Sequence, residues 1–156
     1  MYLHNLQTVL PDLKSSQVII LTRWMQKHDL VQFLQNYDIQ VSNFIEQYAM
    51  RLISNIINMV ENDFPDNRHL VTEEILHAFK DKDINPYDIF CLYQALKDVC
   101  IELIEEGDIL SSHLLLNKER IIIDIYKAFE QLTHDILHFY AEELYSISHD
   151  VKEHSA

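Results

Sequence analysis

The chain has 156 residues and one glycine, Gly107, and its 25 acidic side chains against 12 Lys and Arg give a formal net charge of -13. Phosphate-binding loops of the dinucleotide, P-loop and kinase types need several glycines, so those classes are excluded. The acidic balance disfavours binding to nucleic acid or to an anionic membrane surface. Because 48% of the residues are hydrophobic, a single domain spanning residues 1–156 is expected.

Apolar residues recur at every third or fourth position along most of the chain, which predicts an all-α fold of five or six helices without strands. A short first helix over residues 2–10 is expected to end at Pro11. The second helix is expected to begin at a Ser15/Ser16 N-cap and to reach about residue 37, with a break allowed near residues 27–29. Its apolar side is formed by Ile20, Trp24, Val31 and Leu34.

A third helix is expected over residues 38–62. Its apolar positions follow a spacing of three and four and are Val41, Ile45, Tyr48, Leu52, Ile56 and Met59. Residues 63–67 combine aspartate, proline and asparagine and predict a loop. A short fourth helix is expected over residues 72–80.

The fifth helix has clear signals at both ends. Asn85 is expected as its N-cap, Pro86 as its first residue and Asp88 in its first turn, where a negative charge is favourable. Gly107 is expected at its end, because glycine adopts the left-handed conformation of a helix C-cap at least cost.

After Gly107 the chain contains neither glycine nor proline, which predicts one very long helix or two helices separated by a bend near residues 112–118. An apolar stripe runs along this segment, and its spacing is typical of a packed helical bundle or of a dimer seam. The residues expected on this bundle and dimer face are Ile125, Phe129, Leu132, Ile136, Tyr140, Leu144 and Ile147.

The two cysteines and the chain start bear on the cellular compartment. Cys91 and Cys100 would point to opposite sides of one helix, so they are not expected to pair. The N-terminal segment lacks the features of a signal peptide, and no uncharged run approaches the roughly 18 residues of a membrane helix. A cytoplasmic protein without membrane partners is therefore expected.

Nine histidines make metal binding a hypothesis that geometry can test. His134, His138 and Glu142 follow one another at i, i+4 spacing, which can hold a metal ion on one helix face. Helical projection nevertheless places His134 and His138 roughly 160° from Ile136 and the core, so a solvated polar face is the favoured interpretation and no metal is expected. Glu73 and His77 repeat this arrangement on the fourth helix.

Two histidines are expected to point inward, His28 near Trp24 and His113 beside Leu110 and Leu114. Haem binding would use one such histidine, although a hydrogen-bonded core or boundary histidine is the favoured interpretation, and a position at a helix break is a further alternative for His28. A candidate ligand pocket is formed by Trp24, His28, Phe90 and Tyr93.

Three segments resemble the RsbR-type (RsbRD) N-terminal sensory domains. Residues 18–25 (VIILTRWM) are similar to the opening helix, residues 84–104 (INPYDIFCLYQALKDVCIELI) to the middle helix, and residues 119–145 to the last helices of that family. The resemblance implies a globin-like helical fold without haem, dimerisation through the final helices, and a position upstream of a signalling output domain. The resemblance identifies no catalytic residue in this chain.

These observations lead to three hypotheses. The first is a non-enzymatic cytoplasmic sensor domain that forms a homodimer and relays a signal to an output domain or partner protein. The second is a haem- or metal-binding helical protein, using His28 or His113 for haem and the His134, His138 and Glu142 set for metal. The third is a structural or adaptor bundle without a ligand.

Overall fold

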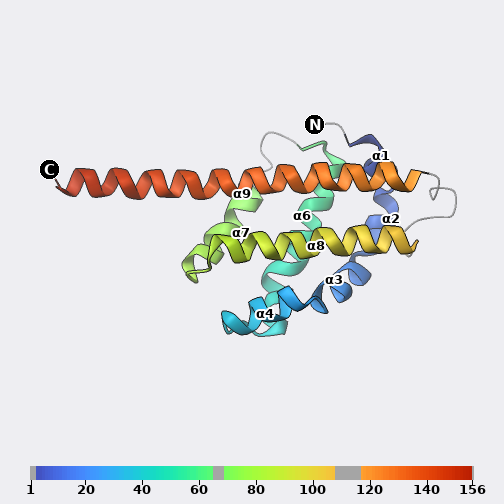
Figure 1. Cartoon of the computed structure of the whole chain (residues 1–156), viewed down its shortest axis with the longest axis horizontal. Helices are drawn as coiled ribbons and strands as arrows, with labels where there is room; N and C mark the ends of the chain where they lie inside the picture. Colours follow the sequence, from blue (N-terminus) through green and yellow to red (C-terminus); the bar gives the residue numbers. More distant parts are fainter. Residues whose placement is uncertain (1–2, 65–68, 108–116, 156) are drawn as a thin grey trace.

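The computed structural model describes residues 3–64, 69–107 and 117–155, with side chains described within residues 3–64, 72–107 and 117–142 (Figure 1). Within these ranges the chain is all-α, as predicted, and contains no strand. In chain order the elements are α1 (His4–Gln7), α2 (Leu10–Ser15), α3 (Gln17–Met25), α4 (His28–Asn36), α5 (Val41–Phe44), the π-helical turn η1 (Ile45–Ala49), α6 (Met50–Glu61), α7 (His69–Asp81), α8 (Pro86–Glu106) and α9 (Lys118–Ser155).

Helices α8 and α9 lie side by side and run in opposite directions (Figure 1). Helices α6 and α7 cross this pair, α3 and α4 pack along α8, and α1 packs on α9. The C-terminal end of α9 extends past the other helices. Most of the shorter helices therefore pack against α8 or α9.

An aromatic cluster fills the part of the core between α3, α4, the α5–η1 segment and α7. The ring centroids of Trp24 and Phe44 lie 5.7 Å apart, those of Phe33 and Phe79 6.0 Å, and those of Tyr48 and Phe79 5.0 Å. All five side chains are buried. Offset and edge-on aromatic pairs of this kind add about 0.5–1.5 kcal/mol each beyond their buried area.

A buried carboxylate holds the N-terminal segment on α9. Asp124 is only 3% exposed, and its Oδ2 accepts a hydrogen bond of 3.0 Å from the backbone N–H of Leu6. Leu6 lies in the first turn of α1, where backbone amides have no partner within the helix. Asp124 therefore satisfies an amide that would otherwise be buried and unpaired.

The ends of α8 confirm the sequence signals. The side chain of Asn85 accepts a hydrogen bond from the Tyr87 amide at 2.9 Å, Pro86 is the first helical residue, and Gly107 is left-handed with φ of 79°. The Tyr37 hydroxyl adds a link to α4, because it accepts from the Asn85 amide at 3.0 Å and donates to Asp88. Burial and the hydrogen bond to Asp88 raise the pKa of Tyr37.

The first two expected helices differ from prediction in their boundaries. Pro11 does not end a helix but lies in the first turn of α2, where its missing amide hydrogen costs nothing. The allowed break in the second helix is present at Gln26 and Lys27, between α3 and α4. Ile20, Trp24 and Leu34 are buried as predicted, but the helix phase changes at the break, so Val31 is exposed and Leu30 and Phe33 are buried as well.

The expected third helix contains the π-helical turn η1. A π turn holds one extra residue, so the positions before it are rotated relative to those after it. This rotation explains why Val41 is exposed and Phe44 is buried, whereas Tyr48, Leu52 and Met59 lie in the core as predicted. The fourth and last helices are present as α7 and α9, while the expected bend near residues 112–118 falls mostly outside the described residues.

Candidate functional site

The outer side of the α8/α9 pair carries an unusual share of exposed apolar side chains. Nine large hydrophobic side chains are exposed within the described part of the chain, and five of them lie on these two helices. Tyr87 and Leu137 are the most exposed of the five, at 68% and 62%. The five residues, which we call the α8/α9 outer face, are Tyr87, Phe90, Ile123, Tyr126 and Leu137.

Helical spacing places the exposed apolar side chains of each helix on one side of that helix, and Phe90 and Tyr126 meet at the groove between the two helices. On α9, Ile123, Tyr126 and Leu137 fall on a line with Glu130 and Thr133 at intervals of three and four residues. On α8, Tyr87 and Phe90 begin a similar line. Because α8 and α9 are antiparallel neighbours, the two lines border a shared groove of about 290 Å³. It is lined by Phe90, Gln94, Lys97, Tyr126, Phe129, Glu130 and Thr133.

The groove lining carries one cation, Lys97, and one carboxylate, Glu130. Lys97 Nζ lies 5.0 Å from the centroid of the Tyr126 ring and donates to Gln94 Oε1 at 2.6 Å. A cation over an aromatic ring at this distance contributes about 0.5–1 kcal/mol at an exposed site. Lys127 and Glu130 are exposed on α9 nearby. A surface of apolar side chains with charges of both signs suits protein contacts rather than catalysis.

Polar contacts on the opposite side of α8 hold the face in place. Arg23 on α3 donates to both carboxylate oxygens of Glu106 at 2.9 Å, and Lys27 pairs with Glu102. The buried indole N–H of Trp24 donates to the Leu92 carbonyl oxygen at 3.2 Å. These contacts fix α8 against α3, so the outer face is presented on a rigid element.

A second feature is a cavity of about 40 Å³ between the N-terminal helices and the α8/α9 pair. Twelve side chains from α1, α2, α3, α6, α8 and α9 line it, and all are hydrocarbon except for the thiol of Cys100. An unfilled volume of this size costs on the order of 1 kcal/mol of stability at about 24 cal/mol per Å³. The cavity is too small for haem.

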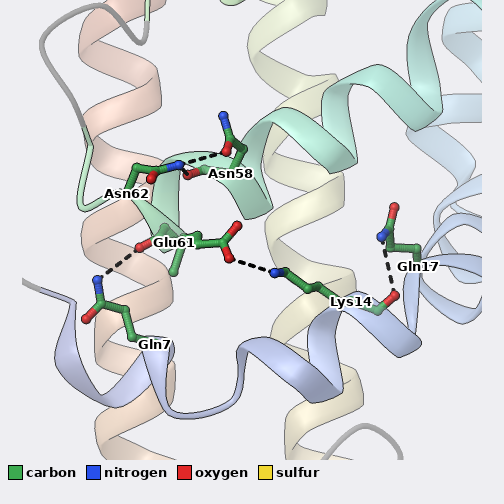
Figure 2. A network of polar contacts seen from close by, with 7 residues as sticks. Gln7, Lys14, Gln17, Asn58, Glu61 and Asn62 are labelled. Carbon is green, nitrogen blue, oxygen red and sulfur yellow. Dashed lines mark hydrogen bonds and ion pairs between the residues drawn. The ribbon is translucent and has the colours of Figure 1, made fainter.

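Figure 2 shows polar contacts among the N-terminal helices and the end of α6, the elements that carry part of the cavity lining. Lys14 Nζ lies 2.7 Å from Glu61 Oε1, Gln7 Nε2 donates to the Val60 carbonyl oxygen at 3.1 Å, and Gln17 Nε2 donates to the Lys14 carbonyl oxygen at 3.3 Å. They tie α1, α2 and α3 to each other and to the end of α6. The Lys14–Glu61 pair is half exposed, so it contributes at most about 1 kcal/mol.

The four residues of the predicted ligand pocket differ in burial: Trp24 and Tyr93 are buried, whereas His28 and Phe90 are exposed. Trp24 and Tyr93 are buried in the core, and Phe90 lies on the outer face. The inward orientation expected for His28 is wrong: His28 is the first residue of α4 and is exposed, because the break after α3 resets the helix phase. Burial raises the pKa of Tyr93, with smaller contributions from Asp135 and Tyr140.

His134 and His138, the α9 histidines whose side chains are described, lie where helical projection placed them. His134 and His138 are exposed, and His138 Nε2 is 3.1 Å from Glu142 Oε1. His77 is exposed as well, with its ring packed edge-on against Phe139 at 4.8 Å. In the described ranges no three metal-ligating side chains come together. His113 lies outside the described residues.

The predicted stripe on α9 is a bundle face. Ile125, Phe129, Leu132 and Ile136 are buried within the chain's own core, so they are not available as a dimer face. Tyr140 is half-buried, and the side chains of Leu144 and Ile147 lie outside the described ones. The outer face was not predicted: the spacing of Ile123, Tyr126 and Leu137 indicates a second apolar stripe, but only the structure shows that this stripe is exposed.

The cysteines are free, as expected. Burial raises the pKa of the Cys100 thiol to about 12. Cys91 is half-buried beside Tyr87, and the hydrogen bond between their side chains raises the pKa of the Tyr87 hydroxyl.

Comparisons with protein families, with curated proteins and with solved structures give no significant match. Over the residues that the structure describes, no helix combines the length and the apolar character needed to cross a membrane.

Proposed function

We propose that the chain is a non-enzymatic cytoplasmic input domain for signalling, and that its α8/α9 outer face binds a second copy of the chain. The observation that carries this proposal is the concentration of exposed apolar side chains on one helix pair. Scattered exposed hydrophobic residues are normal, whereas residues gathered on one rigid surface indicate a contact with another protein.

The pattern on α9 favours a second copy as the partner. Ile123 and Leu137 lie seven residues before and seven residues after Glu130, so the stripe has an aliphatic side chain at the same distance on each side of Glu130. A two-fold axis near Glu130 would place Ile123 of one copy on Leu137 of the other, and the reverse contact follows by symmetry. Lys127 of each copy would then lie within about one helical turn of the other copy's Glu130, which offsets the repulsion between the two carboxylates.

Burial of Ile123 and Leu137 alone does not offset the free-energy cost of forming a dimer. Ile123 and Leu137 are 53% and 62% exposed, so burying the remaining surface of these four side chains in two copies contributes about 3–7 kcal/mol, at roughly 1.5–3 kcal/mol for a fully exposed side chain. Association costs roughly 4–15 kcal/mol in lost translational and rotational freedom. The aromatic groups Phe90 and Tyr126 must therefore contribute too, and the expected dimer depends on protein concentration.

The signalling role follows from the resemblance to RsbR-type sensory domains and from the shape of α9. The resemblance implies dimers formed through the final helices and an output domain or partner protein that receives the signal. Helix α9 packs in the bundle over one part of its length and extends past it over another. A shift of α9 between two packed arrangements would be carried along the rigid helix to such a partner.

Sedimentation velocity over a range of concentrations tests the proposal. The unaltered chain should shift from monomer to dimer as concentration rises, and Leu137→Glu should prevent this shift. Val18→Glu, which places the same charge on an apolar side chain of α3 that is 69% exposed, is the matched control and should still dimerise. A chain that stays monomeric at every concentration would refute the proposal, and a Soret band in its absorption spectrum would favour a haem protein instead.

A further inference from the structure

The cavity between the N-terminal helices and the α8/α9 pair has the properties of a small binding site. Ten of its twelve lining residues are buried, including Leu96 and Ala128, whereas Ile56 and Cys100 are half-buried. The half-buried pair marks the side on which the cavity comes nearest to solvent.

The chemistry of the lining selects against water. A water molecule needs two to four polar partners, and purely apolar cavities stay dry. The walls offer hydrocarbon groups and one thiol, with no hydroxyl, amide or charged group. Because burial raises the pKa of that thiol to about 12, the thiol is neutral at physiological pH.

The volume limits the size of an occupant. A water molecule needs roughly 10–15 Å³ of such space, so 40 Å³ accommodates a molecule of two or three non-hydrogen atoms. From the geometry of the cavity and its hydrocarbon lining, we infer that the chain binds a small uncharged apolar molecule, of the size of dioxygen, between α6, α8 and α9. This inference is independent of the proposed dimer, because none of the five outer-face side chains lines the cavity.

Xenon is the first probe, and the measurement is the chemical shift of dissolved ¹²⁹Xe with the full chain. The expected result is a saturable shift that is lost in Ala128→Leu, because the larger side chain fills the cavity. Ala141→Leu makes the same change at an exposed position of the same helix and should leave the shift unchanged. A shift that rises without saturation, or one that is equal in the two variants, would overturn the inference.

A second variant covers the case in which Ala128→Leu does not fold. Cys100→Ala enlarges the cavity and should strengthen the xenon shift, and an unchanged or weaker shift in a folded variant would count against the site. Dioxygen is the second probe, read as paramagnetic relaxation of methyl groups. The methyl groups of Leu96 and Ala128 should relax faster than those of Leu76, which is equally buried but does not line the cavity. Equal relaxation at the three residues would exclude dioxygen.

Discussion

The buried face and the outer face of α9 share one helix and one spacing, yet they have different roles. The buried face includes Ile125, Leu132 and Ile136, which lie in the core. The outer face has Ile123 and Leu137, but Glu130 and Thr133 interrupt it. The difference shows that the continuous apolar stripe packs within the chain, whereas the interrupted stripe lies on the surface.

The largest expected contrast comes from the same substitution on the two faces. Leu132→Ala removes a side chain that is 1% exposed and should lower the free energy of unfolding by about 2–5 kcal/mol, because it leaves a cavity. Leu137→Ala should change it by less than about 0.5 kcal/mol at concentrations where the chain is monomeric. Urea denaturation of both variants measures the difference. Comparable losses at the two positions would mean that Leu137 belongs to the core.

Substitution of Asp124 is expected to cause the next largest loss of stability, because this carboxyl side chain lies among buried residues of α9. Asp124→Ala should destabilise the chain by about 1–3 kcal/mol, because the Leu6 amide would be left buried and unpaired. Asp124→Asn retains a side-chain oxygen and should recover part of the loss. Thermal unfolding of the two variants makes the comparison. If alanine and asparagine behave alike, the hydrogen bond to Leu6 is not what anchors α1.

Cys100 gives the smallest effect. Its thiol pKa is raised from an ordinary value of 9.0 to about 12, so folding disfavours the thiolate. The corresponding stability is fully present below pH 9 and is lost as the pH rises from 9 towards 12. Between pH 8 and pH 10 the loss should be about 1 kcal/mol. Cys100→Ala lacks this contribution, so its stability should fall less over that interval, and parallel pH profiles from urea denaturation would show that the thiol is accessible.

The helices with local signals at their ends could be predicted from the sequence. Asn85, Pro86 and Gly107 fix the bounds of α8 through capping and the left-handed end, and both effects depend only on neighbouring residues. The bundle role of Leu132 and Ile136 was also readable, because a dense stripe at helical spacing requires burial.

The orientation of side chains beyond a helix interruption could not be predicted. The break after α3 resets the phase for His28 and Val31, and η1 rotates Val41 relative to Tyr48. Neither interruption contains a glycine or proline that would indicate it in the sequence. Which of two stripes on α9 faces the core is likewise decided by the other helices, so the outer face became visible only in the assembled bundle.

Cross-linking at Glu130 tests the central claim most directly. In a background of Cys91→Ser and Cys100→Ala, Glu130→Cys places one thiol near the proposed two-fold axis, where it meets its own copy. Glu46→Cys places the same thiol at an exposed position of η1. We expect mild oxidation to convert the Glu130→Cys chain to a covalent dimer, while the Glu46→Cys chain stays monomeric. Equal cross-linking of the two variants, or none in either, would contradict it.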